Sequence, residues 1–159
     1  MMNNKQLAGV FTLIANLLEI KGEIIYKTLA YRKAAESLES LGREASEYWK
    51  EGKLSDIPGV GKAIAEKIEE LLSTGKLEFL EKVKKEVPES LAGWLQVPSL
   101  GPKKIAAIWR ALNITTLPEL EAAAKAGKLR DLPGMGAKSE AAILDGIASL
   151  ARRSGRIPL

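Results

Sequence analysis

Neither cysteine nor histidine occurs among the 159 residues of this chain. Without cysteine, disulfides and thiol catalysis are excluded. Without either residue, so are zinc fingers and every mechanism that uses an imidazole as base or ligand. The missing cysteines are typical of a reducing, intracellular compartment. Any function must therefore be carried out without these two side chains.

Long apolar runs are missing as well. No run approaches the ~18 residues that a transmembrane helix needs, so we expect no contact with a membrane. The segment MMNNKQLAGVFTLIANLLEIKGE at the start of the sequence lacks a cationic lead and a small-residue cleavage site. It therefore predicts a helix and not a signal peptide.

What the chain does contain is enough apolar sequence for a core. Hydrophobic residues make up 46% and charged residues 28%, a balance typical of a folded globular protein. Twenty-four Lys and Arg stand against twenty Asp and Glu, which gives a net charge of +4. This charge permits a polyanionic partner but does not by itself require one.

Helical periodicity dominates, since apolar residues recur at three- and four-residue spacing. A first helix follows a cap at Asn3 or Asn4, and a second runs from about Glu23 to Leu41 and stops at Gly42. The residues expected to face inward are Leu7, Val10, Phe11, Ile14, Leu17 and Leu18 in the first helix, and Leu29, Ala30, Ala34, Leu38 and Leu41 in the second. Nowhere do β-branched and aromatic residues alternate over the length of a strand. We therefore predict an all-α fold.

An internal repeat is the strongest signal in the sequence. GKLSDIPGVGKAIAEKI begins at Gly52, QVPSLGPKKIAAI at Gln96 and GKLRDLPGMGAKSEAAI at Gly127. Their closing glycines, Gly61, Gly101 and Gly136, are 40 and then 35 residues apart. Each turn follows an expected short helix, around residues 45–50, 89–95 and 117–126, so each unit reads as helix, tight hairpin, helix. The segment at Glu86, Val87 and Pro88 is the expected boundary between domains 1–87 and 88–159.

These turns resemble the helix-hairpin-helix motif, with its apolar-Pro-Gly-apolar-Gly hairpin. Glycines let the main chain approach a phosphate closely, and the following helix offers unpaired amides at its positive end. Such contacts bind DNA backbone without reading sequence. The residues expected to carry them are Gly59, Val60, Gly61, Ser99, Gly101, Lys103, Lys104, Gly134, Gly136 and Lys138. The alternative is a turn that only joins two helices. This alternative is less favoured because the hairpin occurs three times and lysines follow the glycines in each copy.

The copies are not identical. Ser99 replaces the first glycine of the second hairpin, which predicts a strained or shifted turn. Glu140 stands in the third copy where a small residue usually packs, so its phosphate role is the weakest of the three. The motif resemblance also implies a K⁺ or Na⁺ ion at the hairpin carbonyls of Ile57, Val60, Val97 and Leu100.

Lys67 is a feature of the first copy alone, because its counterparts are Ala107 and Ala142. It lies at the edge of the expected buried stripe of Ile64, Ala65, Ile68, Leu71 and Leu72, opposite Glu66, Glu69 and Glu70. Partial burial and nearby lysines disfavour an ammonium, and a free amine can attack an aldehyde. The alternative is a boundary lysine whose stem covers the core while its head reaches water.

Two stretches, YKTLAYRKAAESL from Tyr26 and IPGVGKAIAEKIEELLSTGKL from Ile57, closely resemble the N-terminal domain of the family X DNA polymerases, the family of DNA polymerase beta. The remainder, through RRSGRIPL, is similar to the bacterial or archaeal branch. The resemblance implies a lyase-like domain at 1–87 and a second DNA-binding domain with two hairpins at 88–159. It also implies sequence-independent binding of gapped, nicked or abasic DNA by a monomer in a prokaryotic cytoplasm, associated with the nucleoid.

In several members of that family, the N-terminal domain removes 5′-deoxyribose phosphate by β-elimination. The Schiff-base lysine of that reaction aligns with Lys67, and the 5′-phosphate residues align with Lys27 and Tyr31. Other lysines of the family's pocket fall on Ser55, Ala63 and Phe79, and Lys62 is the expected substitute. The elimination calls for no cofactor.

A polymerase active site is not expected in this chain. Nucleotidyl transfer needs clustered aspartates that hold two metal ions, and Mg²⁺ would matter only with such a palm domain. Here Asp56, Asp131 and Asp145 are isolated in sequence. We therefore expect the N-terminal part of such a polymerase, or a free-standing relative. A non-enzymatic helix-hairpin-helix DNA binder and a helical scaffold with partner contacts at Trp49, Trp94 or Trp109 remain as alternatives.

Overall fold

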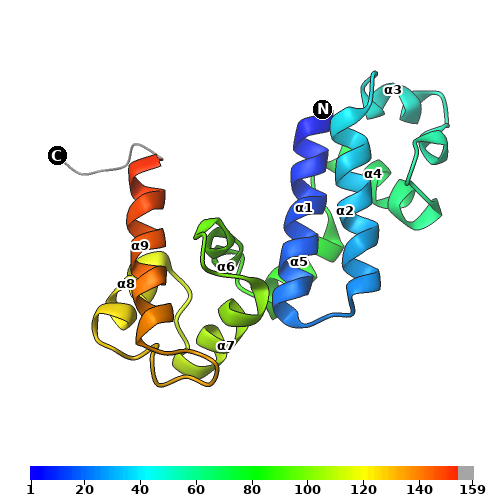
Figure 1. The fold of residues 1–159 in the computed structure, drawn as a ribbon. Coiled ribbons are helices and arrows are strands. Elements are labelled where there is room, and N and C mark those ends of the chain that lie inside the picture. Colours follow the sequence, from blue (N-terminus) through cyan, green and yellow to red (C-terminus); the bar gives the residue numbers. More distant parts are fainter. Residues whose placement is uncertain (154–159) are drawn as a thin grey trace. The chain divides into compact units, whose positions relative to one another are not determined.

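The computed structural model describes residues 1–153, and within that range every regular element is a helix, which confirms the all-α prediction (Figure 1). Most of the RRSGRIPL segment used in the resemblance lies outside the described residues. The chain divides into two compact units, Met1–Val87 and Pro88–Leu159. The functional roles assigned to these two units from sequence stay predictions.

Unit 1 begins with a helical pair, α1 (Asn4–Lys21) and α2 (Ile25–Ser40), which lie side by side (Figure 1). Its other elements are α3 (Ala45–Lys50), the 3-10 turn η1 (Leu54–Asp56), α4 (Lys62–Thr74) and α5 (Glu78–Glu86). Unit 2 contains α6 (Ser90–Gly93), η2 (Trp94–Gln96), α7 (Pro102–Leu112), α8 (Leu117–Lys125) and α9 (Ala137–Arg153).

The start of α1 resolves the choice between two caps. Asn3 forms a capping box: its Oδ1 accepts the Gln6 amide at 2.8 Å, and Gln6 Oε1 accepts the Asn3 amide at 2.9 Å. Asn4 instead forms side-chain hydrogen bonds with the loop before α3. Its Nδ2 donates to the Arg43 carbonyl and its Oδ1 accepts the Ala45 amide, both at 2.7 Å. The two asparagines thus fix both the helix end and a contact some 40 residues along the chain.

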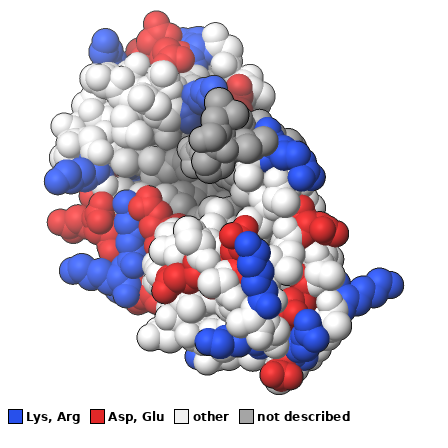
Figure 2. Space-filling view, turned by 90° about the vertical axis from the view of Figure 1, so that its left-hand side faces the viewer, with Lys and Arg blue, Asp and Glu red and all other residues white. Residues whose placement is uncertain are grey.

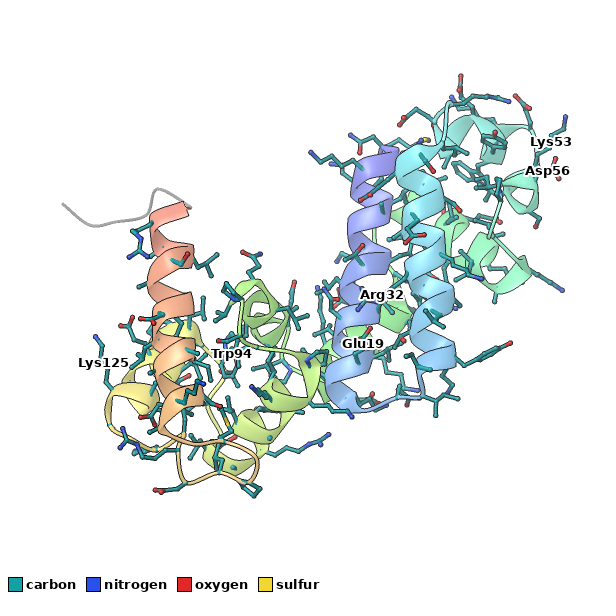
Figure 3. The ribbon with its side chains drawn as sticks, in the orientation of Figure 1. Glu19, Arg32, Lys53, Asp56, Trp94 and Lys125 are labelled. Atoms are coloured by element: carbon teal, nitrogen blue, oxygen red, sulfur yellow. The ribbon has the colours of Figure 1, made fainter. Side chains whose placement is uncertain are left out.

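The pair α1–α2 is joined by apolar packing and by hydrogen bonds that Arg32 donates to Asn16 and Glu19. Leu7, Phe11 and Ile14 of α1 and Leu38 of α2 are fully buried. Arg32 Nε donates to Glu19 Oε1 at 2.9 Å, and the two side chains point toward one another in Figure 3.

The expected inward face of α2 was wrong in its first half. Leu29 is 47% exposed and Ala30 is also exposed, whereas Thr28, Ala34, Ala35 and Leu38 are buried. The spacing of the apolar residues alone was compatible with burial of either of two adjacent faces of α2. Thr28 occupies the buried one because its hydroxyl donates to the Ile25 carbonyl at 2.9 Å and so needs no water.

Unit 2 packs around Trp94, which is fully buried (Figure 3). Glu140 is also buried, at 2% exposure, and its carboxylate accepts the backbone amides of Leu129 and Arg130, both at 3.1 Å. The Arg130 guanidinium donates to the same carboxylate at 2.7 Å and lowers the pKa of this carboxyl. Glu140 therefore fixes the loop that leads into the third hairpin.

Gly146 of α9 marks a close approach of helix and turn. A Cβ added there would lie 2.7 Å from Val97 Cγ1 and 3.1 Å from Pro98 Cδ. Inside a helix, Gly→Ala ordinarily stabilises by about 1 kcal/mol. Here we expect Gly146→Ala to destabilise by about 1–3 kcal/mol through overpacking. Thermal unfolding checks this against Gly9→Ala in α1, where an added Cβ has no neighbour within 4 Å. A gain in stability for both variants would contradict the close packing.

Within the described residues, no helix combines the length and apolar character that a membrane crossing demands.

Candidate nucleic-acid interface

The three repeats fold into three hydrogen-bonded turns: hairpin I (residues 57–61), hairpin II (97–101) and hairpin III (132–136). In each turn the fourth residue donates its amide to the carbonyl of the first at 3.0 Å. The bonds are Val60 N to Ile57 O, Leu100 N to Val97 O, and Met135 N to Leu132 O. Gly61 and Gly101 are the N-caps of α4 and α7, and α9 begins directly after Gly136. Each hairpin therefore leads straight into a helix start.

The predicted disturbance at Ser99 takes the form of a different turn type. Gly59 and Gly134 have φ of 78° and 77°, as type II turns require at their third residue. Ser99 is absent from the positive-φ residues of the described chain, among which Asn113 is the single non-glycine. With proline second and the closing hydrogen bond kept, a negative φ gives a type I turn. Hairpin II therefore differs from the other two hairpins in the orientation of its central peptide. This turn does not require a positive φ at Ser99.

The hairpins also differ in how far they reach the surface. Gly59, Gly61 and Gly134 are exposed, whereas Ser99 and Gly101 are half-buried. Gly136 is half-buried as well, and the apolar residues between the glycines, Val60 and Leu100, point into the protein. The main chain of hairpin I is therefore the most accessible of the three.

Lysines gather in the first turns of the helices that follow. Lys62, Lys103 and Lys138 are exposed, and Lys104 is half-buried. The first turns of α4 and α7 contain no acidic residue. Cations at a helix N-terminus oppose the helix dipole, so this placement disfavours the isolated helix and favours a bound anion. In α9 the single acidic residue of the first turn is Glu140, which is turned inward to Arg130.

Unit 1 has a pocket of about 480 Å³ between α1, α2, α4 and α5. Its lining residues are Leu18, Lys21, Glu23, Tyr26, Lys27, Ala30, Tyr31, Ala63, Ile64, Phe79, Lys82, Val83 and Glu86. The predicted phosphate residues Lys27 and Tyr31 are thus brought together. Lys62 and Lys67 do not line this pocket, although their helix does so through Ala63 and Ile64.

Lys67 is connected to the pocket by an aromatic column. Tyr31 stacks between Phe11, at 6.2 Å between ring centroids, and Phe79, at 5.8 Å. The half-buried Lys67 places its Nζ 5.1 Å from the centroid of the Phe79 ring. The ring face attracts an ammonium, and both interpretations of Lys67 remain compatible with this position. Burial raises the pKa of the Tyr31 hydroxyl, which keeps it protonated as a donor at neutral pH.

Two of the three lysines that line the pocket, Lys21 and Lys27, have acidic partners. Lys21 Nζ lies 2.7 Å from Glu86 and 3.5 Å from Glu23, and Lys27 Nζ lies 3.3 Å from Glu23. The hydrogen bond that Lys27 donates lowers the pKa of the Glu23 carboxyl, and the hydrogen bond that Lys21 donates to Glu86 raises the pKa of Lys21. The Glu23 carboxylate is therefore charged at neutral pH.

Sequence reasoning missed Lys21, Lys82 and both glutamates of the pocket. A local signal was present in α5, where Phe79, Lys82 and Glu86 are spaced by three and four residues and so share one face. Nothing in the sequence near Lys21 indicated its partner Glu86.

Charge elsewhere is mixed. On the face shown in Figure 2, Lys and Arg side chains are interspersed with Asp and Glu. Attraction of a polyanion to that face would therefore come from local groups of lysines.

Comparison with known proteins agrees with the fold. Residues 2–77 match the family model of a helix-hairpin-helix domain, and residues 94–149 match that of a SAM-like helix-hairpin-helix tandem. Over 158 residues the chain is 35% identical to DNA polymerase/3′-5′ exonuclease PolX of Bacillus subtilis (strain 168). The alignment covers 99% of this chain and 27% of that protein, so the chain spans about a quarter of the length of this relative. The predicted helix-hairpin-helix domains and the predicted relationship are both confirmed.

Proposed function

We propose that this chain, a homologue of the N-terminal helix-hairpin-helix region of bacterial PolX, binds gapped or nicked DNA without reading its sequence. The hairpins would contact the phosphodiester backbone, and the pocket of unit 1 would hold the 5′-phosphate at the gap. The observation that carries the proposal is the threefold recurrence of a hydrogen-bonded turn that opens into a lysine-bearing helix start.

Backbone binding is supported by the exposed amides of these turns. An anion at the start of α4 or α7 would interact with unpaired N–H groups, the positive end of the helix dipole and the lysines beside it. Since none of these groups faces a base edge, affinity should fall steeply with salt and depend little on sequence. A scaffold that binds protein partners would show no such dependence, and Trp94 is too buried to serve as a partner contact.

The 5′-phosphate site is supported by the hydrogen-bond donors that line the pocket together with Lys27. The ammonium of Lys27 and the hydroxyl of Tyr31 line one pocket, and Lys82 adds a third donor from α5. These groups suit the oxygens of a terminal phosphate. Lys62, outside the lining, would contribute at longer range.

The second part of the proposal is 5′-deoxyribose-phosphate lyase chemistry at Lys67. Its free amine would attack the C1′ aldehyde of the opened sugar, and loss of water would give an iminium. The iminium acidifies C2′, a base removes that proton, and the C3′–O bond breaks with its electron pair leaving on the phosphate. The assignment is supported by proximity, because Phe79 contacts Lys67 and stacks on Tyr31 of the phosphate pocket. A purely non-enzymatic DNA-binding module is the alternative.

We also propose that a monovalent cation binds at the hairpin carbonyls. Carbonyl oxygens are suitable ligands for such an ion, and those of Ile57 and Val97 each use one lone pair on the turn amide, which leaves the other. The Val60 and Leu100 carbonyls follow in the same turns. We also propose that the protein is a monomer that associates with DNA inside the cell. Mg²⁺ would be needed only together with a palm domain.

Single Gly→Ala substitutions at the closing glycines test backbone binding. At Gly61, Gly101 and Gly136, φ is not positive and an added Cβ would have no neighbour within 4 Å, so the protein itself accepts alanine. A phosphate that approaches the main chain there would meet the new methyl group. We expect roughly 5- to 20-fold weaker binding for Gly61→Ala, the cost of about one lost charge-assisted contact.

The measurement is fluorescence anisotropy of gapped duplex DNA at several salt concentrations, with Gly9→Ala as the matched control. Thermal unfolding of each variant shows whether the fold is kept. Unchanged affinity in all three hairpin variants, or binding by the wild type that ignores salt, would argue against backbone recognition by the hairpins.

A further inference from the structure

Glu23 stands between the two α1–α2 lysines of the pocket. Its carboxylate lies 3.3 Å from Lys27 Nζ and 3.5 Å from Lys21 Nζ. The glutamate is the least accessible of the three, with its side chain 24% exposed, against 59% for Lys27 and 37% for Lys21. The least exposed of these three charged groups is therefore an anion.

A ligand phosphate needs the donors that Glu23 already uses. An ammonium has three N–H donors, so Lys27 can exchange one acceptor for another without moving far. While Glu23 stays paired, however, its charge offsets that of Lys27 and repels an incoming dianion. Glu86 holds Lys21 in the same way from α5, at 2.7 Å.

We propose that Glu23 determines the strength of 5′-phosphate recognition, as an internal competitor that must release Lys27 before a terminal phosphate is bound. The inference rests on the proposed function, because it concerns the same pocket. A terminal phosphate carries close to two negative charges at neutral pH and so competes well with one carboxylate. The competition keeps affinity moderate, which lets a bound DNA end leave again.

Glu23→Gln tests the proposal, because glutamine keeps the size of the side chain and removes its charge. We measure the affinity for gapped DNA with a 5′-phosphate and with a 5′-hydroxyl, and take the ratio. Partly exposed ion pairs are weak, so the ratio should rise by roughly 3- to 5-fold. Glu36→Gln is the matched control: it removes one charge from an exposed position on α2 that does not line the pocket.

A second variant separates competition from general charge. In a Lys27→Ala background, Glu23→Gln should give a clearly smaller gain, because the Glu23–Lys27 pair is already missing and only the longer contact with Lys21 is left to break. A rise equal to that of Glu36→Gln, or an undiminished gain without Lys27, would overturn the competitor role. So would a fall in the ratio, which would make Glu23 a residue that orients Lys27.

The same data distinguish the two levels of the proposal. If the wild type prefers the 5′-phosphate but Glu23→Gln leaves the ratio unchanged, the phosphate site stands and the competitor fails. If neither protein prefers the 5′-phosphate, the phosphate site itself is overturned and the inference falls with it.

Discussion

Substitution of Lys67 by arginine should abolish covalent trapping of the protein on DNA while DNA binding is kept. Borohydride reduces an iminium between a lysine and the C1′ aldehyde to a stable amine, so trapped complex reports the Schiff base directly. Arginine keeps the positive charge above Phe79 but stays protonated and is no nucleophile. On gapped DNA with a 5′-deoxyribose phosphate, we expect trapping below about 1% of wild type for Lys67→Arg and Lys67→Ala.

Lys76→Ala is the control, since Lys76 is an exposed lysine just after α4 that does not line the pocket and has no proposed role in binding. At saturating protein its trapping should match the wild type. Equal trapping by wild type, Lys67→Arg and Lys67→Ala would remove Lys67 from the chemistry. Absence of trapping in the wild type, with binding intact, would favour the non-enzymatic module.

The largest loss of stability is expected at Glu140. Truncation to alanine leaves two backbone amides and the Arg130 guanidinium without their shared acceptor, in a place that is 2% exposed to water. Buried donors without partners are costly, so the midpoint of thermal unfolding of unit 2 should fall by roughly 5–15 °C. Circular dichroism during heating measures this, and tryptophan fluorescence in a Trp49→Phe background follows unit 2, which contains Trp94 and Trp109.

The pH dependence of this effect has a definite sign. The pKa of Glu140 is lowered in the folded state, so its contribution is present above the ordinary pKa near 4.5 and is lost as pH falls through the folded value. The difference between wild type and Glu140→Ala should therefore be constant from about pH 6 to 8 and shrink below about 4.5. Glu121→Ala, which breaks an exposed pair with Lys125, is the control and should change little. A constant difference down to acid pH would contradict the role of the charge.

Much of this fold could be predicted because the residues that begin and end its helices and turns act locally. Proline and glycine at fixed positions specify the hairpins, and Asn3 with Gln6 specifies the start of α1. The face that α2 buries could not be read in the same way. Leu29 and Ala30 fit an apolar stripe as well as their neighbours do, and tertiary packing decided between the faces.

The site was predictable in part for the same reason. Lys27 and Tyr31 are one turn apart on α2, so their common pocket follows from helix geometry. The Glu23–Lys27 pair also has helical spacing, but the Lys21–Glu86 pair joins residues 65 positions apart and requires the tertiary fold. The role of Glu86 therefore could not be predicted from sequence motifs alone.

The type I turn of hairpin II bears on how such motifs are found in other sequences. A search pattern that demands glycine at both hairpin positions passes over VPSLG, although its closing hydrogen bond matches those of the other two copies. The first position needs glycine only where φ is positive, and a turn with its central peptide reversed admits an ordinary L-residue. A pattern built on the apolar residues, the proline and the closing glycine would recover all three copies and expose the degenerate members of this repeat.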